Sequence, residues 1–183
     1  DGKSIYLYDY EQKSILLKEV GRLRESTFRK VGEGTGKRRD TDEYDKYYRH
    51  LVLWDEDELE VVGSYRIGQG REIYDVYGKE GFYTNFLFTF SREFEAFLPY
   101  SIELGRSFVQ PRYWGSRALD YLWYGLGAYL KKHPFAKYMF GPVSLPGSYP
   151  KEAKKLLAYF YGTYFRAPQK YATSKNPFVL SKS

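Results

Sequence analysis

The sequence predicts one domain with a mixed α/β fold, in which helices flank a central sheet. Segments that alternate like strands and segments with helical periodicity follow one another, and several of the strands form hairpins. In the middle of the chain a strand-like run ends at Pro111, a glycine-containing turn follows, and a long amphipathic helix begins. The length of 183 residues fits a single domain, 1–183, with a substantial core.

Six segments have the alternation or the apolar runs that are typical of strands. The expected strands cover residues 4–9 (a strand or an arm), 50–54, 61–67, 83–88, 101–110 and 137–143. The acidic residues 55–58 between the second and third strands are typical of a hairpin turn. We expect loops at residues 31–45 and 69–81, and the tail from 166 to 183 has no clear periodicity.

Four segments are expected to be helices. Leu16, Val20 and Leu23 recur at helical spacing within residues 14–28. Ser91 can cap a short helix that runs to residue 97, and a last helix spans 150–165. The longest helix covers 115–132 and ends at the His133-Pro134 pair. Its apolar face consists of Leu119, Leu122, Trp123, Leu126 and Leu130.

The composition excludes several kinds of chemistry. The chain has no cysteine, which excludes disulfides and thiolate chemistry, and its two histidines argue against a histidine-rich metal site. No apolar run approaches the ~20 residues of a membrane span, so a cytoplasmic domain is expected. The net charge of +6 favours an acidic partner such as nucleic acid, an anionic membrane surface, a phosphate-bearing cofactor or an acidic carrier protein. The 21 tyrosines fit a tyrosine-rich core and surface, or the walls of an amphipathic cleft or acyl tunnel.

The unit of strand, turn and helix at residues 101–132 is suited to holding a phosphate. Free N–H groups and the positive end of a helix dipole meet where such a turn enters a helix. Arg112, Gly115, Ser116 and Arg117 form this turn. An ordinary strand–helix connection is the alternative interpretation.

The strand of this unit carries charges on a segment that should be central in the sheet. Glu103 and Ser107 share one parity with Gly105, whereas Arg106 lies on the other parity among apolar residues. Gly105 in mid-strand predicts a bulge, which would let Glu103 and Arg106 reach one cleft. The alternative is a surface pair, but unpaired buried charge is costly, and this favours a functional role.

Further candidates lie in the first half of the chain. Asp40, Asp42 and Asp45 do not match a calcium-loop pattern, so we interpret them as a polar loop or as a site for a substrate's ammonium group. The glycines of residues 32–36 lack the strand and the Gly-Lys-Ser/Thr sequence of a P-loop. Arg66 can bind a carboxylate in bidentate fashion or can be a surface arginine.

These motifs together resemble a known family. Arg112-x-x-Gly115 resembles the acyl-donor motif of the GNAT superfamily, although Arg117 replaces its last small residue. The closer resemblance is to the long-chain branch that uses acyl carrier protein. This branch contains the acyl-homoserine-lactone (autoinducer) synthases and the ornithine- or glycine-lipid N-acyltransferases, also called hemolysin-like. The matching elements are Arg24-x-x-x-Phe28, Gly34-Thr-Gly36 followed by Asp40, Asp42 and Asp45, Val62-Gly-Ser-Tyr-Arg66, Glu103-Leu-Gly-Arg-Ser107 and Phe140-Gly-Pro-Val-Ser-Leu-Pro-Gly147.

The resemblance implies a GNAT-like, mostly antiparallel sheet and the transfer of a 3-hydroxyacyl chain from acyl carrier protein to the α-amino group of an amino acid, ornithine or glycine. The donor would be an acyl-phosphopantetheine, with no permanently bound cofactor and no metal. Peripheral association with the inner membrane surface is a further expectation, and members of this family usually continue beyond the point where this sequence stops.

The resemblance also implies roles for individual residues. Glu103 would be the general base, with Ser107 as a second catalytic candidate. Backbone N–H groups at Phe108, Val109 and Gln110 would stabilise the oxyanion. The remaining candidates form two groups: Arg112, Gly115, Ser116 and Arg117 for the donor's phosphate and carrier, and Arg24, Phe28, Asp42, Asp45, Arg66 and Arg106 for the amino acid and the shape of the cleft. Lys131 and Lys132 would add to the basic surface for the carrier.

Four alternative functions compete with this one. An autoinducer synthase would use S-adenosylmethionine as the amine donor, and a general acyl-CoA-dependent GNAT would act on a polyamine or an antibiotic. A nucleic-acid-binding module fits the charge, but the chain lacks a clustered basic–aromatic motif, so no nucleic acid partner is expected. A pore-forming hemolysin is disfavoured because no long amphipathic or apolar membrane segment is present.

Overall fold

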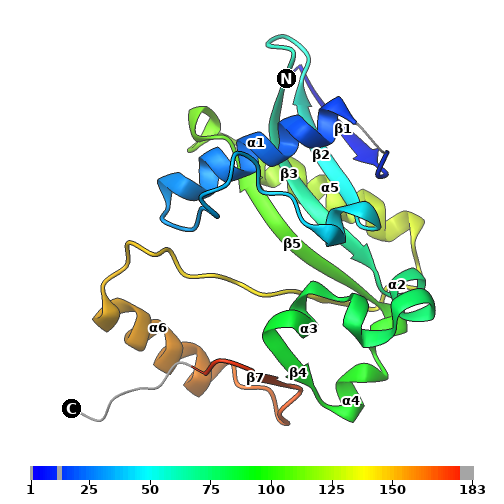
Figure 1. Cartoon of the computed structure of the whole chain (residues 1–183), viewed down its shortest axis with the longest axis vertical. Coiled ribbons are helices and arrows are strands. Elements are labelled where there is room, and N and C mark those ends of the chain that lie inside the picture. The colour runs from blue at the N-terminus through cyan, green and yellow to red at the C-terminus, as the bar shows by residue number, and fades with distance from the viewer. Residues whose placement is uncertain (1, 12–13, 178–183) are drawn as a thin grey trace.

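The computed structural model describes residues 2–11 and 14–177 and has a five-stranded sheet in the order β1-β2-β3-β5-β6 (Figure 1). All neighbours are antiparallel except β5 and β6, which are parallel. The strands of this sheet are β1 (Lys3–Tyr8), β2 (Arg49–Asp55), β3 (Glu60–Gln69), β5 (Ser101–Val109) and β6 (Tyr138–Phe140). Two short strands, β4 (Phe88–Phe90) and β7 (Ala172–Ser174), form a separate antiparallel pair. The predicted mixed, mostly antiparallel sheet is confirmed.

Helices and short 3-10 turns connect these strands. The α-helices are α1 (Ile15–Lys30), α2 (Gly70–Tyr77), α3 (Tyr83–Leu87), α4 (Arg92–Glu95), α5 (Ala118–Lys132) and α6 (Lys151–Tyr164). The 3-10 turns are η1 (Glu43–Lys46), η2 (Gly78–Gly81), η3 (Leu98–Tyr100) and η4 (Pro111–Tyr113). Ser14 caps α1 and Ser91 caps α4 by accepting a hydrogen bond from a backbone N–H three residues later. None of the described helices is long and apolar enough to cross a membrane.

The helices α1 and α5 cover opposite faces of the sheet. Leu51 and Leu53 of β2 pack with Leu122 of α5, whereas Val52 between them packs with Val20 of α1. Neighbouring residues of a strand point to opposite faces, so these contacts place the two helices on different sides. Gly125 allows α5 to approach closely, because a Cβ there would press against Leu51.

The sequence placed three elements incorrectly around the sheet. Residues 69–81 are not a loop but contain α2 and η2, and residues 83–88 are mostly the helix α3 rather than a strand. The first residue of α2, Gly70, has to be a glycine, because a Cβ at that position would overlap the carbonyl oxygens of Leu98 and Ser101. The glycine thus reflects close packing rather than a flexible loop. The predicted strand 137–143 is shorter and ends at Phe140.

The long helix begins three residues later than predicted, at Ala118. Gly115 has φ +78°, a left-handed conformation that cannot continue a right-handed helix. The buried face is also rotated from the predicted one, since Leu119 and Trp123 are exposed while Ala118, Leu122, Gly125, Leu126 and Tyr129 are buried. The close approach of Gly125 to the sheet accounts for this rotation.

The predicted bulge in β5 is present, one residue beyond Gly105. Arg66 of β3 pairs with Gly105 and Ser64 pairs with Phe108, so two residues of β5 oppose one of β3. Arg106 adopts φ +49° at this point, which is unusual for a residue with a side chain. The bulge turns the Arg106 side chain toward the α1 face of the sheet, where it meets Asp40 and Asp42.

Candidate active site

Three arginines and three aspartates form a compact cluster on the α1 face. Arg24 comes from α1, Arg66 from β3 and Arg106 from β5, and the segment leading to η1 supplies Asp40, Asp42 and Asp45. Arg24 and Arg66 are each only 1% exposed. The cluster is charge-balanced, which is how buried ions avoid a large desolvation cost.

Asp45 is the centre of this cluster. Its carboxylate accepts hydrogen bonds from Arg24 at 3.0 Å and from Arg66 at 3.1 Å. It also accepts the backbone N–H of Asp42 at 2.8 Å, which fixes the turn η1. Burial acts to raise the pKa of Asp45, but the guanidiniums of Arg24 and Arg66 overcome it and lower the pKa to about 2. Asp45 is therefore ionised at neutral pH, and its ion pairs hold Arg24 and Arg66 in place.

His50 lies next to the cluster, with its Nε2 atom 3.7 Å from the carboxylate of Asp45. Nothing in the sequence indicated this position. His50 is the direct partner of Arg66 across β2 and β3, so both side chains point to the α1 face. Burial lowers the pKa of His50 to about 4, against the opposing influence of Asp45. Neither ring nitrogen has a hydrogen-bond partner among the described residues.

Arg106 and Asp42 are the members of the cluster that reach solvent. Their side chains are 22% and 25% exposed, whereas those of the other four are at most 3% exposed. The two contact each other at 3.4 Å, and Arg106 also donates to the hydroxyl of Tyr83 at 3.3 Å and lies over its ring. A substrate can meet the cluster at this pair.

Glu103 faces the same side but is 1% exposed. One carboxylate oxygen accepts the backbone N–H of Thr84 at 2.6 Å and its hydroxyl, and the other accepts the backbone N–H of Tyr83 at 3.0 Å and the hydroxyl of Tyr48. Burial raises the pKa of Glu103, while these hydrogen bonds act in the opposite direction. Glu103 and Arg106 both contact Tyr83, Glu103 through its backbone N–H and Arg106 through its hydroxyl.

The outer edge of β5 is open beyond the bulge. Within the described residues β6 pairs only with Ser101–Glu103, and Ser144 already contacts Glu33 beyond α1 at 2.7 Å. Figure 1 shows the chain after β6 running away from β5. The chain after β6 therefore diverges from β5 and, in the described part of the chain, leaves the later part of this strand edge unpaired.

Only part of the predicted oxyanion site faces this opening. The N–H of Gln110 donates to Val62 of β3, so the N–H of Val109 points the opposite way, toward the open edge. A hollow of about 190 Å³ lies there, lined by Ser107, Phe108, Val109 and residues of β3 and α5. Ser107 is exposed, and Trp114 donates its indole N–H to the Val109 carbonyl at 2.8 Å.

The predicted phosphate-binding turn is exposed and partly occupied by internal contacts. Arg112 forms ion pairs with Glu58 at 3.0 Å and Glu60 at 2.7 Å, across the β2–β3 hairpin. Ser116 accepts the N–H of Ala118 through its hydroxyl. Arg117 lies over the ring of Tyr121 and contacts Asp120 at 3.6 Å.

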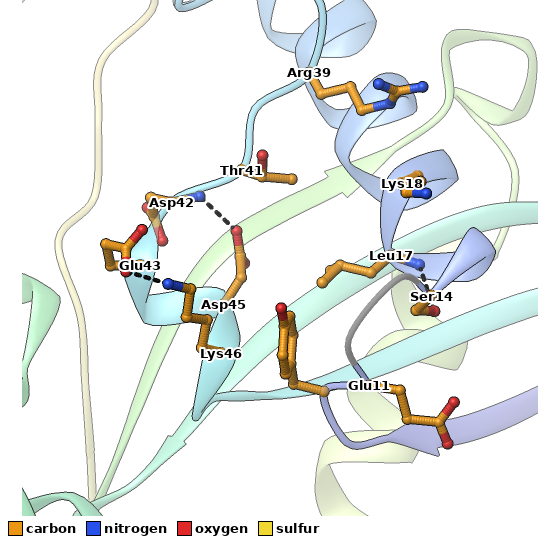
Figure 2. A pocket seen from close by; sticks show the side chains of 11 residues that line it. Glu11, Ser14, Leu17, Lys18, Arg39, Thr41, Asp42, Glu43, Asp45 and Lys46 are labelled. Atoms are coloured by element: carbon orange, nitrogen blue, oxygen red, sulfur yellow. Dashed lines mark hydrogen bonds and ion pairs between the residues drawn. The ribbon is translucent and has the colours of Figure 1, made fainter.

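A larger hollow of about 350 Å³ borders the cluster from its other side (Figure 2). Figure 2 shows Leu17 and Lys18 of α1 on one wall and Asp42, Glu43 and Lys46 on the other. No residue of β5 lines this hollow, so it is separate from the open edge where Ser107 and Val109 lie.

The remaining predicted residue, Phe28, is half-buried and packs on the apolar cluster of Val20 and Phe108. Sequence reasoning missed the residues that hold Glu103, which are Tyr48, Tyr83 and Thr84. Tyr48 directly precedes the expected strand 50–54, and its ring lies against Gly68. The small residue opposite a tyrosine was a usable signal, but nothing in the sequence pointed to Thr84.

Comparison with known proteins identifies the family. Residues 23–124 match the model of the acetyltransferase (GNAT) domain, which includes the cluster, Glu103 and the β5–α5 turn. The chain belongs to the GNAT family. No solved structure matches the chain significantly.

Curated relatives within the GNAT family act on amino acids, according to their names. The chain is 40% identical to the glycine N(alpha)-acyltransferase of Phocaeicola vulgatus over 96% of the chain and 58% of the relative. It is 37% identical to the glycine N(alpha)-acyltransferase of Bacteroides thetaiotaomicron over 98% of the chain and 57% of the relative. Identity to the L-ornithine N(alpha)-acyltransferase of Rhizobium meliloti is 32% over 79% of the chain and 49% of the relative. The chain thus spans just over half the length of the glycine enzymes.

Proposed function

We propose that the protein is an N-acyltransferase that moves a 3-hydroxyacyl chain from acyl carrier protein to the α-amino group of an amino acid. Glycine is the favoured acceptor, because identity is 40% to a glycine enzyme and 32% to an ornithine enzyme. The observation that carries the proposal is that the open strand edge at Val109 follows, along the same strand β5, the residue Arg106 that forms the solvent-facing pair with Asp42. A thioester on the edge and an amino acid at the pair would be neighbours.

The reaction assigns a role to each part of the site. The amine attacks the thioester carbonyl, its proton goes to a base, and the carbon–sulfur bond breaks to release the thiol of the carrier. Glu103 is the proposed base, and burial, which raises its pKa, suits a group that must take up a proton near neutral pH. The N–H of Val109 would bind the oxyanion. Asp42 would bind the ammonium form of the amino acid, and Arg106 its carboxylate.

The donor would be held at the β5–α5 turn. Arg112 and Arg117 are exposed there and would bind the phosphate of phosphopantetheine, with Gly115 and Ser116 supplying the turn. An acidic carrier would dock at these exposed arginines, and raising the salt should weaken this docking because exposed charges are screened over ~8–10 Å. A free acyl-pantetheine should be much less sensitive to salt.

Mass spectrometry of the products tests the proposal. The protein is incubated with 3-hydroxyacyl carrier protein and an equimolar mixture of isotopically labelled glycine, ornithine and S-adenosylmethionine. We expect N-acylglycine as the main product and a drop of about 100-fold or more in Glu103→Gln, because an amide cannot take up the proton. Formation of an acyl-homoserine lactone, or turnover of acetyl-CoA without turnover of the carrier substrate, would refute the proposal.

A further inference from the structure

The carboxylate of Glu103 has no free acceptor position for a proton. A carboxylate offers about four lone-pair sites, two on each oxygen. The described residues fill all of them, through the two groups of Thr84, the N–H of Tyr83 and the hydroxyl of Tyr48. If Glu103 is the base of the proposed reaction, one of these donors must turn away when the proton arrives.

Among the described residues, the hydroxyl of Tyr48 is the only one of these donors that both can turn and has another acceptor at hand. It lies 3.4 Å from the carbonyl oxygen of Gly81. That oxygen already accepts the hydroxyl of Tyr47 at 3.0 Å, but a carbonyl has two lone pairs and can accept both. The two backbone N–H groups on Glu103 are fixed by the first turn of α3, and that of Tyr83 also donates to the Tyr48 oxygen at 3.1 Å. The Thr84 hydroxyl has no second acceptor among the described residues.

We propose that Tyr48 is a positioning residue whose hydroxyl switches between two acceptors, Glu103 when that carboxylate is ionised and Gly81 when it is protonated. The inference rests on the proposed base role of Glu103. In the switch no bond of Tyr48 breaks. Its O–H turns to the Gly81 carbonyl, and the new O–H of Glu103 donates to the Tyr48 oxygen.

The surroundings of Tyr48 suit such a switch. Its ring is 2% exposed and lies against Gly68, so the ring cannot move while the hydroxyl hydrogen can rotate. Burial and the nearby Glu103 raise the pKa of Tyr48, and its phenol therefore remains a donor at neutral pH. The other groups that act on Glu103 are Arg66 from β3, which favours its ionised form, and the phenols of Tyr44 and Tyr47.

Carbon-13 NMR of labelled glutamate carboxyls and tyrosine Cζ atoms follows the switch without any need for activity. In the wild-type protein we expect the Tyr48 resonance to shift with the same midpoint as the Glu103 carboxyl, and the Tyr47 resonance to remain constant. Tyr48→Phe should raise the pKa of Glu103 above its wild-type value, because a donor to the ionised form is lost. Thr84→Val should act in the same direction and serves if Tyr48→Phe does not fold.

Tyr47→Phe is the matched control, since it removes the neighbouring hydroxyl that shares Gly81 but does not touch Glu103. In Tyr48→Phe kcat should fall about tenfold at the acidic side of the pH profile and recover at higher pH, with KM for the donor unchanged. A Tyr48 resonance that ignores the Glu103 titration, or an unchanged Glu103 titration in Tyr48→Phe, overturns the switch. A shifted titration with an unshifted activity profile supports the hydroxyl contact but removes Glu103 from its proposed role as base.

Discussion

The two faces of the central sheet use the same strands for different purposes. On the α5 face, Leu51, Leu53 and Ile67 pack against Leu122 and Leu126, and each of these residues is at most 2% exposed. On the α1 face, the neighbours His50 and Arg66 are each 1% exposed and lie in or beside a cluster of charges. Non-directional apolar contacts stabilise the first face, whereas the second depends on paired charges whose loss is costly. The difference separates the residues that hold the fold from those that we assign to chemistry.

The largest expected effect comes from removing one charge of the cluster. Arg66→Met leaves Asp42 and Asp45 without a main partner, and breaking a buried ion pair costs ~3–5 kcal/mol. We expect the free energy of unfolding to fall by that amount and transfer to be lost, as measured by urea unfolding and product assays. Arg22→Met is the matched control, because its pair with Glu19 is exposed and worth less than about 1 kcal/mol. Equal stability of the two variants would show that the cluster is not energetically coupled.

The α5 face should respond in stability alone. Leu126→Ala opens a cavity among Leu51, Leu53 and Leu122, and such changes cost about 2–5 kcal/mol. Because Leu126 lies across the sheet from the cluster and does not line the hollow at Ser107 and Val109, the folded fraction should transfer acyl groups at nearly the wild-type kcat. Val76→Ala, at a position on α2 that is 70% exposed, should cost less than about 1 kcal/mol. A large loss of kcat in folded Leu126→Ala would mean that the two faces are not independent.

Acid should destabilise the α1 face through His50. Its pKa is about 4 in the folded protein and near 6.5 when exposed, so between these values the unfolded chain binds a proton that the folded chain does not. The contribution of His50 to the free energy of unfolding is therefore fully present above about pH 6.5. It falls as the pH drops, by about 3 kcal/mol near pH 4. Asp45, whose pKa is about 2, adds to the loss only at lower pH. Urea unfolding at several pH values measures the slope.

A variant without the imidazole should flatten that slope. His50→Gln is expected to lose most of the dependence between pH 6.5 and pH 4, whereas His133→Gln should keep it. His133 lies at the end of α5, beyond the cluster. The same slope in both variants would assign the acid sensitivity to other groups.

The smallest effect is expected at the exposed β5–α5 turn. Arg112→Ala and Arg117→Ala remove surface charges and should change stability little. We expect KM for the acyl donor to rise several-fold, because each arginine would contribute one phosphate contact at a helix N-terminus. KM for the amino acid should stay constant. A rise for the amino acid with no change for the donor would mean that the turn does not hold the phosphate.

The sequence predicted the sheet better than its surroundings. The strands β2 and β3 contain apolar runs and β5 alternates, and Ser14 and Ser91 mark the helix starts where the structure has them. The helix α3 was missed because its aromatic residues favour strands, while Glu103, distant in sequence, binds its first two N–H groups. The positive φ of Gly115 delays the start of α5. The sequence shows that residue 115 is a glycine, but a glycine can adopt either sign of φ.

The candidate site was predictable in its charges but not in its contacts. Arg24, Arg66 and Arg106 were identifiable as unusual charges near apolar segments. Their pairing with Asp40, Asp42 and Asp45 depends on how the segment before η1 folds over the sheet, which no local pattern encodes. The burial of Glu103 under Tyr48 and Thr84 likewise arises from tertiary packing.

The central claim is that the solvent-facing end of the charged cluster binds the acceptor amino acid. It is tested most directly by measuring how the rate of the Asp42→Asn variant depends on the concentration of glycine. The substitution keeps the shape of the side chain and removes its charge at a position that is 25% exposed. We expect kcat/KM for glycine to fall about 10- to 100-fold, as the loss of a hydrogen bond between charged groups would, while KM for the donor stays constant. A value of kcat/KM for glycine equal to that of the wild-type protein would contradict this account.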